Sequence, residues 1–224
     1  MIRPHTKLIS LLCFLLLGCG GGGGGGSSSG GSATTGVRVL NTSMDLPPVS
    51  LTTTAKVGET ISTTKFAEVT GFSELPKGAQ TISVQTVDGG TGPFNFSVTI
   101  QNRDRPQVLV YGTRETYGIN ATLLESEKPK IPDGFAAVRI AHGTTGAASI
   151  KGSVGGQELP EQVNIGNASK YLFVPAGASQ IKVIRSVDSR SFVNQQVQVE
   201  NGKAYTFVVN GEIDYLVMPN LLED

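Results

Sequence analysis

Very few side chains of this sequence could act as a nucleophile, an imidazole base or a soft metal ligand. Its 224 residues include two histidines, His5 and His142, and two cysteines, Cys13 and Cys19. Three of these four lie within the first nineteen positions, so the rest of the sequence holds one imidazole and no thiol. Disulfides, a cysteine nucleophile and zinc coordination by cysteine or histidine are therefore not expected after residue 19. We predict no metal and no cofactor.

Cys19 has the surroundings of a lipid-attachment site. Arg3 and Lys7 accompany a ten-residue apolar run at 8–17, which is too short to span a bilayer because a helix needs about 20 apolar residues. A basic start and a short apolar core are typical of a secretory signal peptide. The run ends in Leu-Leu-Gly-Cys at 16–19, which resembles the bacterial lipobox. The resemblance implies a signal peptide at 1–18, removed before Cys19, and fatty acids such as palmitate on that cysteine.

Residues 20–36 consist almost entirely of glycine, serine and threonine. Such a segment gains too little from burial to offset the entropy of ordering its backbone, so we expect a tether, 19–36 with the cysteine, of roughly 20–25 Å reach. Gly20 rather than aspartate follows the cysteine, which by resemblance to lipoproteins of two-membrane bacteria implies the outer membrane. We therefore expect a lipid-anchored protein of the cell envelope, facing either the periplasm or the surface.

After residue 36 the sequence indicates β-structure. Several short segments are rich in valine, isoleucine, phenylalanine and threonine, and glycine, proline, asparagine and aspartate separate them. These segments are VRVLN at 37–41, TISVQTV at 81–87, FNFSVTIQ at 94–101 and QVLVYG at 107–112. Short strands at this spacing predict an all-β fold of sandwich type.

An internal repeat divides this β-structure in two. TGFSELPKGAQTISV at 70–84 corresponds to SKYLFVPAGASQIKV at 169–183, and VTIQNRDRPQVLVYG at 98–112 corresponds to VQVENGKAYTFVVNG at 197–211, both at an offset of 99. We predict two tandem immunoglobulin-like β-sandwich domains, at 37–125 and 136–224, joined by a linker at 126–135. The repeated positions Pro76 and Pro175, followed by glycine two residues later, predict a turn in each copy.

These repeated motifs resemble the bacterial domain of unknown function 4397. The family begins with Val-Arg-apolar-x-His/Asn, followed by small residues, aspartate and proline; VRVLN at 37–41 with Asp45 and Pro47 fits, as does VRIAH at 138–142. The second copy has Gly146 and Ala148 where the aspartate and proline are expected. The later Val/Leu-Pro-x-Gly turn fits 75–78 and 174–177. The resemblance implies β-sandwiches in an exported, often lipid-anchored protein and no settled activity.

Three polar residues near strand ends could belong to a site. His142 is the only imidazole available as a base, and the loop GTTG follows it. Asn41 occupies its position in the first copy, so we expect both side chains to hydrogen-bond loop backbone rather than to catalyse. Asp45 precedes LPP, where it could ligate calcium, but without further acidic residues nearby we expect it to stabilise a turn.

Four tyrosines near predicted strand ends could together form a binding face, because a large rigid ring loses little entropy on binding. Alternatively, these tyrosines could pack in the core with their hydroxyl groups at its rim. They are Tyr111, Tyr117, Tyr205 and Tyr215.

The charge of the chain argues against nucleic-acid binding. Loss of Arg3 and Lys7 with the signal peptide leaves 16 basic against 18 acidic residues, without a basic patch. We expect a non-enzymatic envelope protein that binds or supports another envelope protein or a glycan through its β-domains. Two alternatives stay open: an exported hydrolase that uses carboxylates or His142, and a dedicated glycan-binding module.

Overall fold

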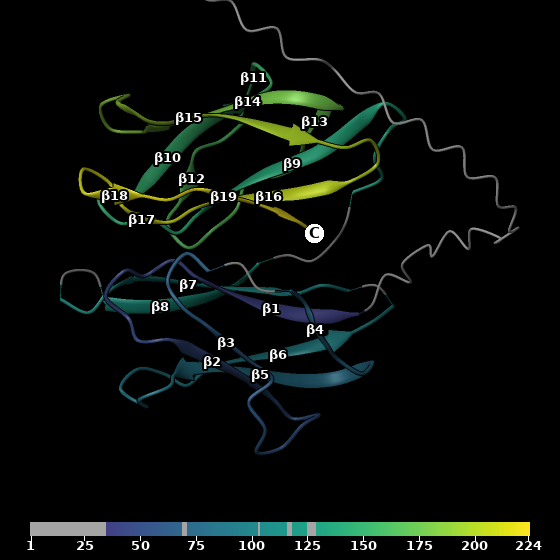
Figure 1. The fold of residues 1–224 in the computed structure, drawn as a ribbon, viewed down its shortest axis with the longest axis vertical. Helices are drawn as coiled ribbons and strands as arrows, with labels where there is room; N and C mark the ends of the chain where they lie inside the picture. Colours follow the sequence, from purple (N-terminus) through teal and green to yellow (C-terminus); the bar gives the residue numbers. More distant parts are fainter. Residues whose placement is uncertain (1–34, 69–70, 103, 116–117, 125–128) are drawn as a thin grey trace, which may run out of the picture. The chain divides into compact units, whose positions relative to one another are not determined.

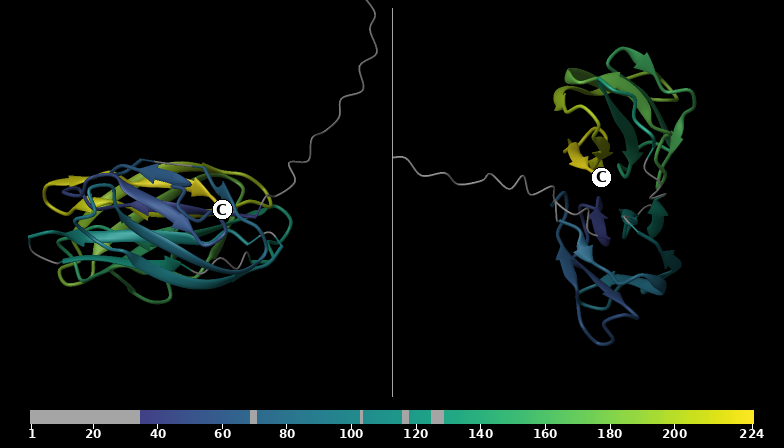
Figure 2. Two further views of the ribbon diagram at one scale, coloured as in Figure 1. Left: turned by 90° about the horizontal axis from the view of Figure 1, so that it is seen from below. Right: turned by 90° about the vertical axis from the view of Figure 1, so that its right-hand side faces the viewer.

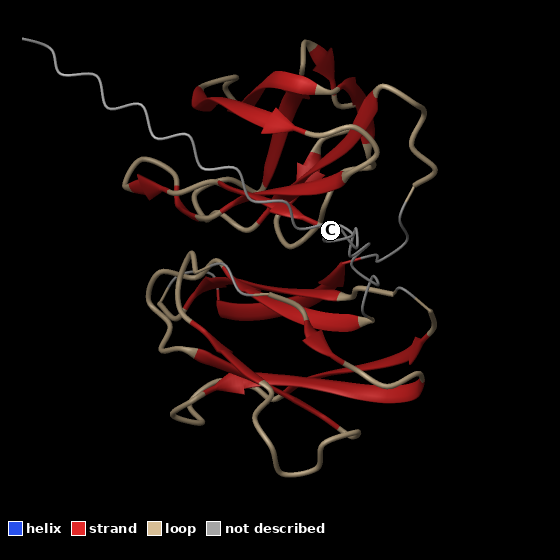
Figure 3. Ribbon diagram, turned by 45° about the vertical axis from the view of Figure 1, so that its right-hand side comes forward, coloured by secondary structure: helices blue, strands red, loops and turns tan. Residues whose placement is uncertain are grey.

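The computed structural model describes residues 35–224 apart from 69–70, 103, 116–117 and 125–128. The predicted signal peptide, Cys19 and nearly all of the predicted tether lie outside the described residues. The described residues form strands and loops and no helix, as Figure 3 shows. The predicted all-β fold is therefore confirmed. No helix in the described part of the chain is long and apolar enough to cross a membrane.

The strands fall into two consecutive sets, which we call the first repeat (36–124) and the second repeat (135–224), and Figure 1 labels them. The strands of the first repeat are β1 (Gly36–Asn41), β2 (Val49–Thr53), β3 (Ser62–Thr64), β4 (Ser73–Glu74), β5 (Gly78–Thr86), β6 (Phe94–Ile100), β7 (Gln107–Thr113) and β8 (Gly118–Leu124).

The second repeat carries the remaining strands. They are β9 (Phe135–His142), β10 (Ser149–Val154), β11 (Gln157–Glu158), β12 (Val163–Asn164), β13 (Leu172–Pro175), β14 (Gly177–Arg185), β15 (Ser191–Val199), β16 (Ala204–Val209), β17 (Gly211–Glu212), β18 (Leu216–Val217) and β19 (Asn220–Glu223). β9 begins one residue inside the predicted linker, and β1 begins on the residue at which the predicted tether ends.

Each repeat contains two sheets with matching strand orders; both sheets of the first repeat have four strands, whereas those of the second have four and five. In the first repeat the strand orders are β4-β1-β7-β8 and β3-β2-β5-β6. In the second repeat the sheet β13-β9-β16-β19 corresponds to β4-β1-β7-β8. The other sheet of the second repeat, β10-β14-β15 with β11 and β12 beside β10, corresponds to β3-β2-β5-β6. The first strand of each repeat pairs in parallel, β1 with β7 and β9 with β16, whereas the other ladders are antiparallel. Figure 2 shows the layers from two further directions.

Alternating side chains from both layers fill the core of each repeat. Ile82 and Val84 of β5 pack with Val37 and Val39 of β1 in the first core, and Ile181 of β14 lies in the equivalent second core. This inward alternation along β5 and β14 agrees with the sequence pattern, because successive side chains of a strand point to opposite faces. The glycines after the repeated prolines, Gly78 and Gly177, have φ of +112° and +120°.

Four strands are buried on both faces rather than on one. Nearly every residue of β1, β7, β9 and β16 is buried. One face of each strand covers the core of its own repeat, so the other face must be covered by something else. That cover is a third apolar cluster, which draws on both repeats: Leu40, Leu109, Leu124, Ala141, Val208 and Leu222.

Candidate functional site

An arginine in the first strand of the first repeat is buried. Arg38 lies between Val37 and Val39, whose side chains enter the core, so the pleat of β1 directs the guanidinium to the opposite face. Its Cζ lies 4.4 Å from the ring centroid of Phe72. The parallel register places Gln107 beside it, and the Gln107 Oε1 accepts hydrogen bonds from Nε at 3.1 Å and Nη2 at 2.9 Å.

The second repeat has the same arrangement. Arg139 of β9 is buried, and its Cζ lies 4.9 Å from the ring centroid of Tyr171. Thr206 is its neighbour in the parallel register, and the Arg139 Nε donates to the Thr206 Oγ1 at 2.9 Å. Tyr171 and Thr206 lie 99 residues after Phe72 and Gln107. Both repeats therefore contain the same arrangement, in which a buried arginine stacks on an aromatic ring and bonds to a polar side chain of the neighbouring parallel strand.

A single carboxylate, that of Asp224, joins the two arrangements. From the first repeat it accepts hydrogen bonds from Arg38 Nη2 at 3.0 Å and Gln107 Nε2 at 2.7 Å. From the second repeat it accepts bonds from Tyr171 at 2.7 Å and from Thr206 at 2.8 Å to one oxygen and 2.7 Å to the other. Because Asp224 is only 6% exposed, these bonds form in a poorly solvated environment, where a charge needs its partners most.

Burial perturbs two of the groups around this carboxylate. Desolvation lowers the pKa of Arg38 to about 10, and Asp224 opposes the shift because its negative charge favours the guanidinium cation. Desolvation raises the pKa of Tyr171, and the neighbouring Asp224 carboxylate raises it further. At neutral pH the arginine is therefore charged and the phenol is protonated, as hydrogen-bond donation to Asp224 requires.

A second set of contacts joins the repeats near the opposite ends of these strands. The Thr42 hydroxyl lies 2.7 Å from the carbonyl oxygen of Val110 and 3.0 Å from that of Gly143. The Tyr111 ring of the first repeat lies against Gly166 of the second, so closely that a β-carbon there would be 2.3 Å from the ring. Contacts of this density make the face between the repeats a packed interior.

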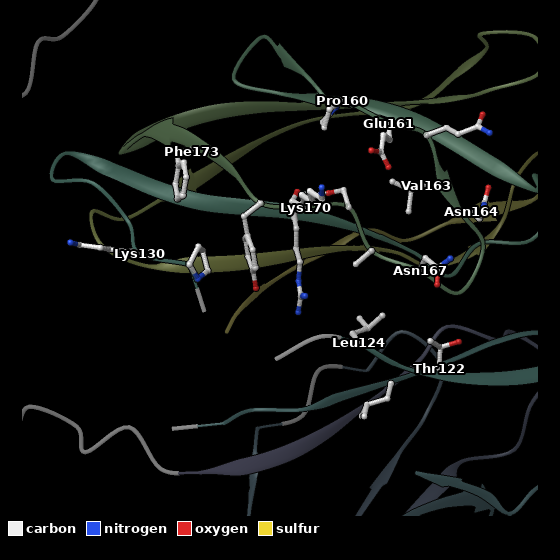
Figure 4. Close-up of a pocket in the computed structure, with 17 residues that line it drawn as sticks. Thr122, Leu124, Lys130, Pro160, Glu161, Val163, Asn164, Asn167, Lys170 and Phe173 are labelled. Carbon is white, nitrogen blue, oxygen red and sulfur yellow. The ribbon is translucent and has the colours of Figure 1, made fainter. Parts of the chain in front are cut away.

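Beside this packed face the two repeats leave a cleft of about 900 Å³. Figure 4 shows its lining residues: Thr122 and Leu124 of β8 lie on one side, and Asn167 and Lys170 from the β12–β13 connection lie on the other. The strands that border the cleft, β8 and β13, are the outer strands of their sheets. Most of the lining side chains are polar, and the charged ones are Lys130, Arg139, Glu161 and Lys170.

The predicted site residues His142 and Asn41 hold loop backbone. His142 is fully buried, and its Nε2 lies 3.1 Å from the carbonyl oxygen of Ala147. A carbonyl only accepts, so Nε2 carries the proton; desolvation lowers the pKa of this histidine to about 4. The Asn41 Oδ1 accepts a bond from the amide of Ser43 at 3.2 Å. Both side chains therefore bond to backbone atoms of the loops that follow β1 and β9.

Asp45 also bonds within its own loops. Its Oδ1 accepts from the Ser43 hydroxyl at 2.9 Å, and its Oδ2 accepts from the backbone amide of Arg114 at 2.7 Å. The carboxylate therefore ties the β1–β2 loop to the β7–β8 turn. Among the described residues, no three histidine, cysteine, aspartate or glutamate side chains are grouped as a metal site would require.

The described tyrosines do not share one surface. Tyr205 is buried in the core of the second repeat, and its hydroxyl accepts a bond from the amide of Glu200 at 3.1 Å. Tyr111 packs in the apolar cluster between the repeats. Tyr215 is 79% exposed, at the turn between β17 and β18. Tyr117, like Cys19, lies outside the described residues.

Arg38, Arg139 and the cleft were not predicted from the sequence. A signal for the arginines was available, because each stands in an otherwise apolar strand, and arginine is almost never fully buried unless it is paired. The shared offset of Phe72 and Tyr171 was also visible. The cleft residues Asn167 and Lys170 carry no such signal, because Asn167 precedes the repeated segment at 169–183 and Lys170 within it corresponds to Gly71.

The fold and the cleft define a protein made of two tandem β-sandwich repeats that pack through equivalent sheets. The chain belongs to the family of the domain of unknown function DUF4397, whose model matches residues 35–152 and again residues 136–224. The two matches confirm the resemblance drawn from the strand-start and turn motifs, and with it the presence of two copies. No curated protein matches the chain.

Proposed function

We propose that this protein is a lipid-anchored, non-catalytic binding module of the bacterial cell envelope, which holds another envelope protein or a glycan in the cleft between its repeats. The observation that carries the proposal is the cleft of about 900 Å³ beside a densely bonded face. Pockets of roughly 300–1,000 Å³ are typical of ligand sites. Because Asp224 bonds to both repeats, the two walls of the cleft are held together for a ligand to bind between them.

The chemistry of the ionisable groups supports binding rather than catalysis. A general base must reach the proton that it abstracts and have a pKa near the working pH. His142 is buried against Ala147, and its pKa is lowered to about 4. Asp188 is paired with Arg185 and Glu200 with Lys203, as solvated loop carboxylates commonly are.

The N-terminal sequence supplies the anchor in this proposal. Leu-Leu-Gly-Cys at 16–19 places the lipid on Cys19, and the glycine- and serine-rich residues 20–36 supply slack between that lipid and the repeats. Two or more acyl chains give stable membrane attachment where one chain does not. In a two-membrane bacterium the proposal assigns the protein to the outer membrane, because glycine follows the cysteine.

The anchor is tested with the full-length chain expressed in a bacterium with a lipoprotein pathway. Intact mass of the membrane fraction should show a chain that begins at Cys19 and carries lipid, and Cys19→Ser should leave that fraction. An unmodified wild-type chain in the soluble fraction would refute the anchor.

The binding role is tested by placing a photo-crosslinking amino acid at Asn167, in the cleft. The matched control site is Lys182, which is exposed on β14 in the other sheet of the same repeat. Adducts with an envelope component are expected from Asn167 and not from Lys182. Equal adducts from both sites, or none from either, would argue against a binding role for the cleft.

A further inference from the structure

Several hydrogen-bonding groups in the cleft have no partner among the described residues. The side-chain amides of Asn164 and Asn167 are exposed and make no hydrogen bond within that part of the chain. The ammonium groups of Lys130 and Lys170 have no carboxylate within 4 Å there, and both side chains are exposed. These groups differ from Arg139 of the same lining, because Arg139 is bonded to Thr206.

The polar character of the lining favours a sugar over an apolar peptide. Amide side chains donate to and accept from hydroxyl groups at the same time, which suits the vicinal hydroxyls of a sugar ring. The half-buried Phe173 supplies an aromatic surface on the same wall. A groove that holds the apolar side of a peptide is instead lined mainly by apolar side chains, and this cleft is not.

The charges of the lining favour an acidic ligand. Three cationic side chains, Lys130, Arg139 and Lys170, face one carboxylate, Glu161. Asp224 lies 4.0 Å from Arg139 and offsets its charge. The two lysines are left to attract anions from solution.

We propose, resting on the binding role given above, that the cleft binds an acidic oligosaccharide. The amides of Asn164 and Asn167 would bind ring hydroxyls, Phe173 would stack on a ring face, and Lys170, with Lys130, would pair with the carboxylates. An acidic peptide shares only the last of these contacts, so the amides distinguish the two ligand classes.

The test titrates the full-length, detergent-solubilised protein with tetragalacturonate and measures binding by calorimetry. The matched control ligand is the methyl ester of the same tetrasaccharide, which keeps every hydroxyl and removes every charge. The acid should bind at least ~10-fold more tightly than the ester, as expected for charge-assisted hydrogen bonds, and its affinity should fall with added salt.

Two variants locate the site and a third serves as the control. Lys170→Gln should weaken binding of the acid by ~10-fold, and Asn167→Ala should weaken binding of both the acid and the ester. Lys182→Gln removes a charge that is also exposed but lies outside the cleft, and should leave both affinities unchanged. Unchanged thermal unfolding of Lys170→Gln shows that its effect is not a folding defect.

Several results would overturn the proposal. These are equal affinity for acid and ester, no effect of Lys170→Gln, an equal effect of Lys182→Gln, or tighter binding of tetraglutamate than of tetragalacturonate. A protein adduct at Asn167 together with no binding of tetragalacturonate would overturn the glycan assignment while the proposed binding role stands. Absence of both would count against the binding role itself.

Discussion

Replacing Asp224 by alanine removes the carboxylate that, in the described part of the chain, bonds to both repeats. The buried guanidinium of Arg38 would keep Gln107 and the carbonyl oxygen of Glu223, at 3.0 Å from its Nη1, but would lose its counter-charge. In the second repeat, the hydroxyls of Tyr171 and Thr206 would lose the acceptor that they share. Gln107 Nε2 would lose the same acceptor, and the buried Arg139 would lose a carboxylate 4.0 Å away. The substitution therefore leaves two buried charges and three hydrogen-bond donors with fewer partners.

The expected loss of stability follows from this burial. The Arg38 and Asp224 side chains are 4% and 7% exposed, so neither is screened by solvent as a surface pair would be. Removing one partner of a buried ion pair costs about 3–5 kcal/mol, because the other charge stays buried without compensation. We expect Asp224→Ala to lower the free energy of unfolding by that amount, and Asp224→Asn by less, because its amide oxygen can still accept one bond.

Urea-induced unfolding of the full-length chain, followed by tyrosine fluorescence, measures the effect. The sequence has five tyrosines and no tryptophan, and Tyr171 reports directly on the network. Glu223→Gln is the matched control: the Glu223 side chain is 50% exposed and pairs with Lys203, so its loss should cost less than about 1 kcal/mol. A cost for Asp224→Ala no larger than that for Glu223→Gln would refute the reasoning.

Two other sites give independent predictions. Burial lowers the pKa of His142 from 6.5 to about 4, so the contribution of this histidine to the free energy of unfolding is fully present above pH 6.5 and falls by roughly 3 kcal/mol as the pH drops toward 4. His142→Asn, which places in the second repeat the residue found at Asn41, should remove that part of the pH dependence in urea titrations. An unchanged pH dependence would contradict this prediction. Gly166→Ala should cost roughly 2–5 kcal/mol, because φ is +83° and the new β-carbon would meet Tyr111. At Gly202, where φ is +75° with open space around it, alanine should cost only about 1–2 kcal/mol; equal costs at the two glycines would show that the ring contact does not matter.

The strands could be predicted from the sequence because their residues follow simple patterns. Alternation at Ile82 and Val84 predicted one buried and one exposed face, and β5 has both. The continuous apolar segment at 107–112 also predicted a strand, but its two-sided burial was missed. The uninterrupted run was the available signal, since a strand covered on both faces cannot alternate. The parallel pairing of β1 with β7 has no local signal, because it joins segments about 70 residues apart.

The candidate site was less predictable than the fold. Histidine, aspartate and tyrosine attract attention because they can do chemistry, yet His142 and Asp45 bond to nearby loops. The cleft depends on how two repeats pack, and no motif in either repeat encodes that packing by itself. Asn167 and Lys170 become candidate binding residues only because the structure places them in the wall of the cleft.

The Asp224 network also sets an order of events during folding. Asp224 lies 186 residues after Arg38, so the first repeat is synthesised long before its arginine can meet that carboxylate. Until then the surface formed by β1 and β7, with Leu40 and Leu109, is open to solvent. An exposed apolar surface of this kind favours association with other chains. Completion of the second repeat therefore protects the first, and synthesis that stalls in the second repeat should leave an aggregation-prone first repeat behind.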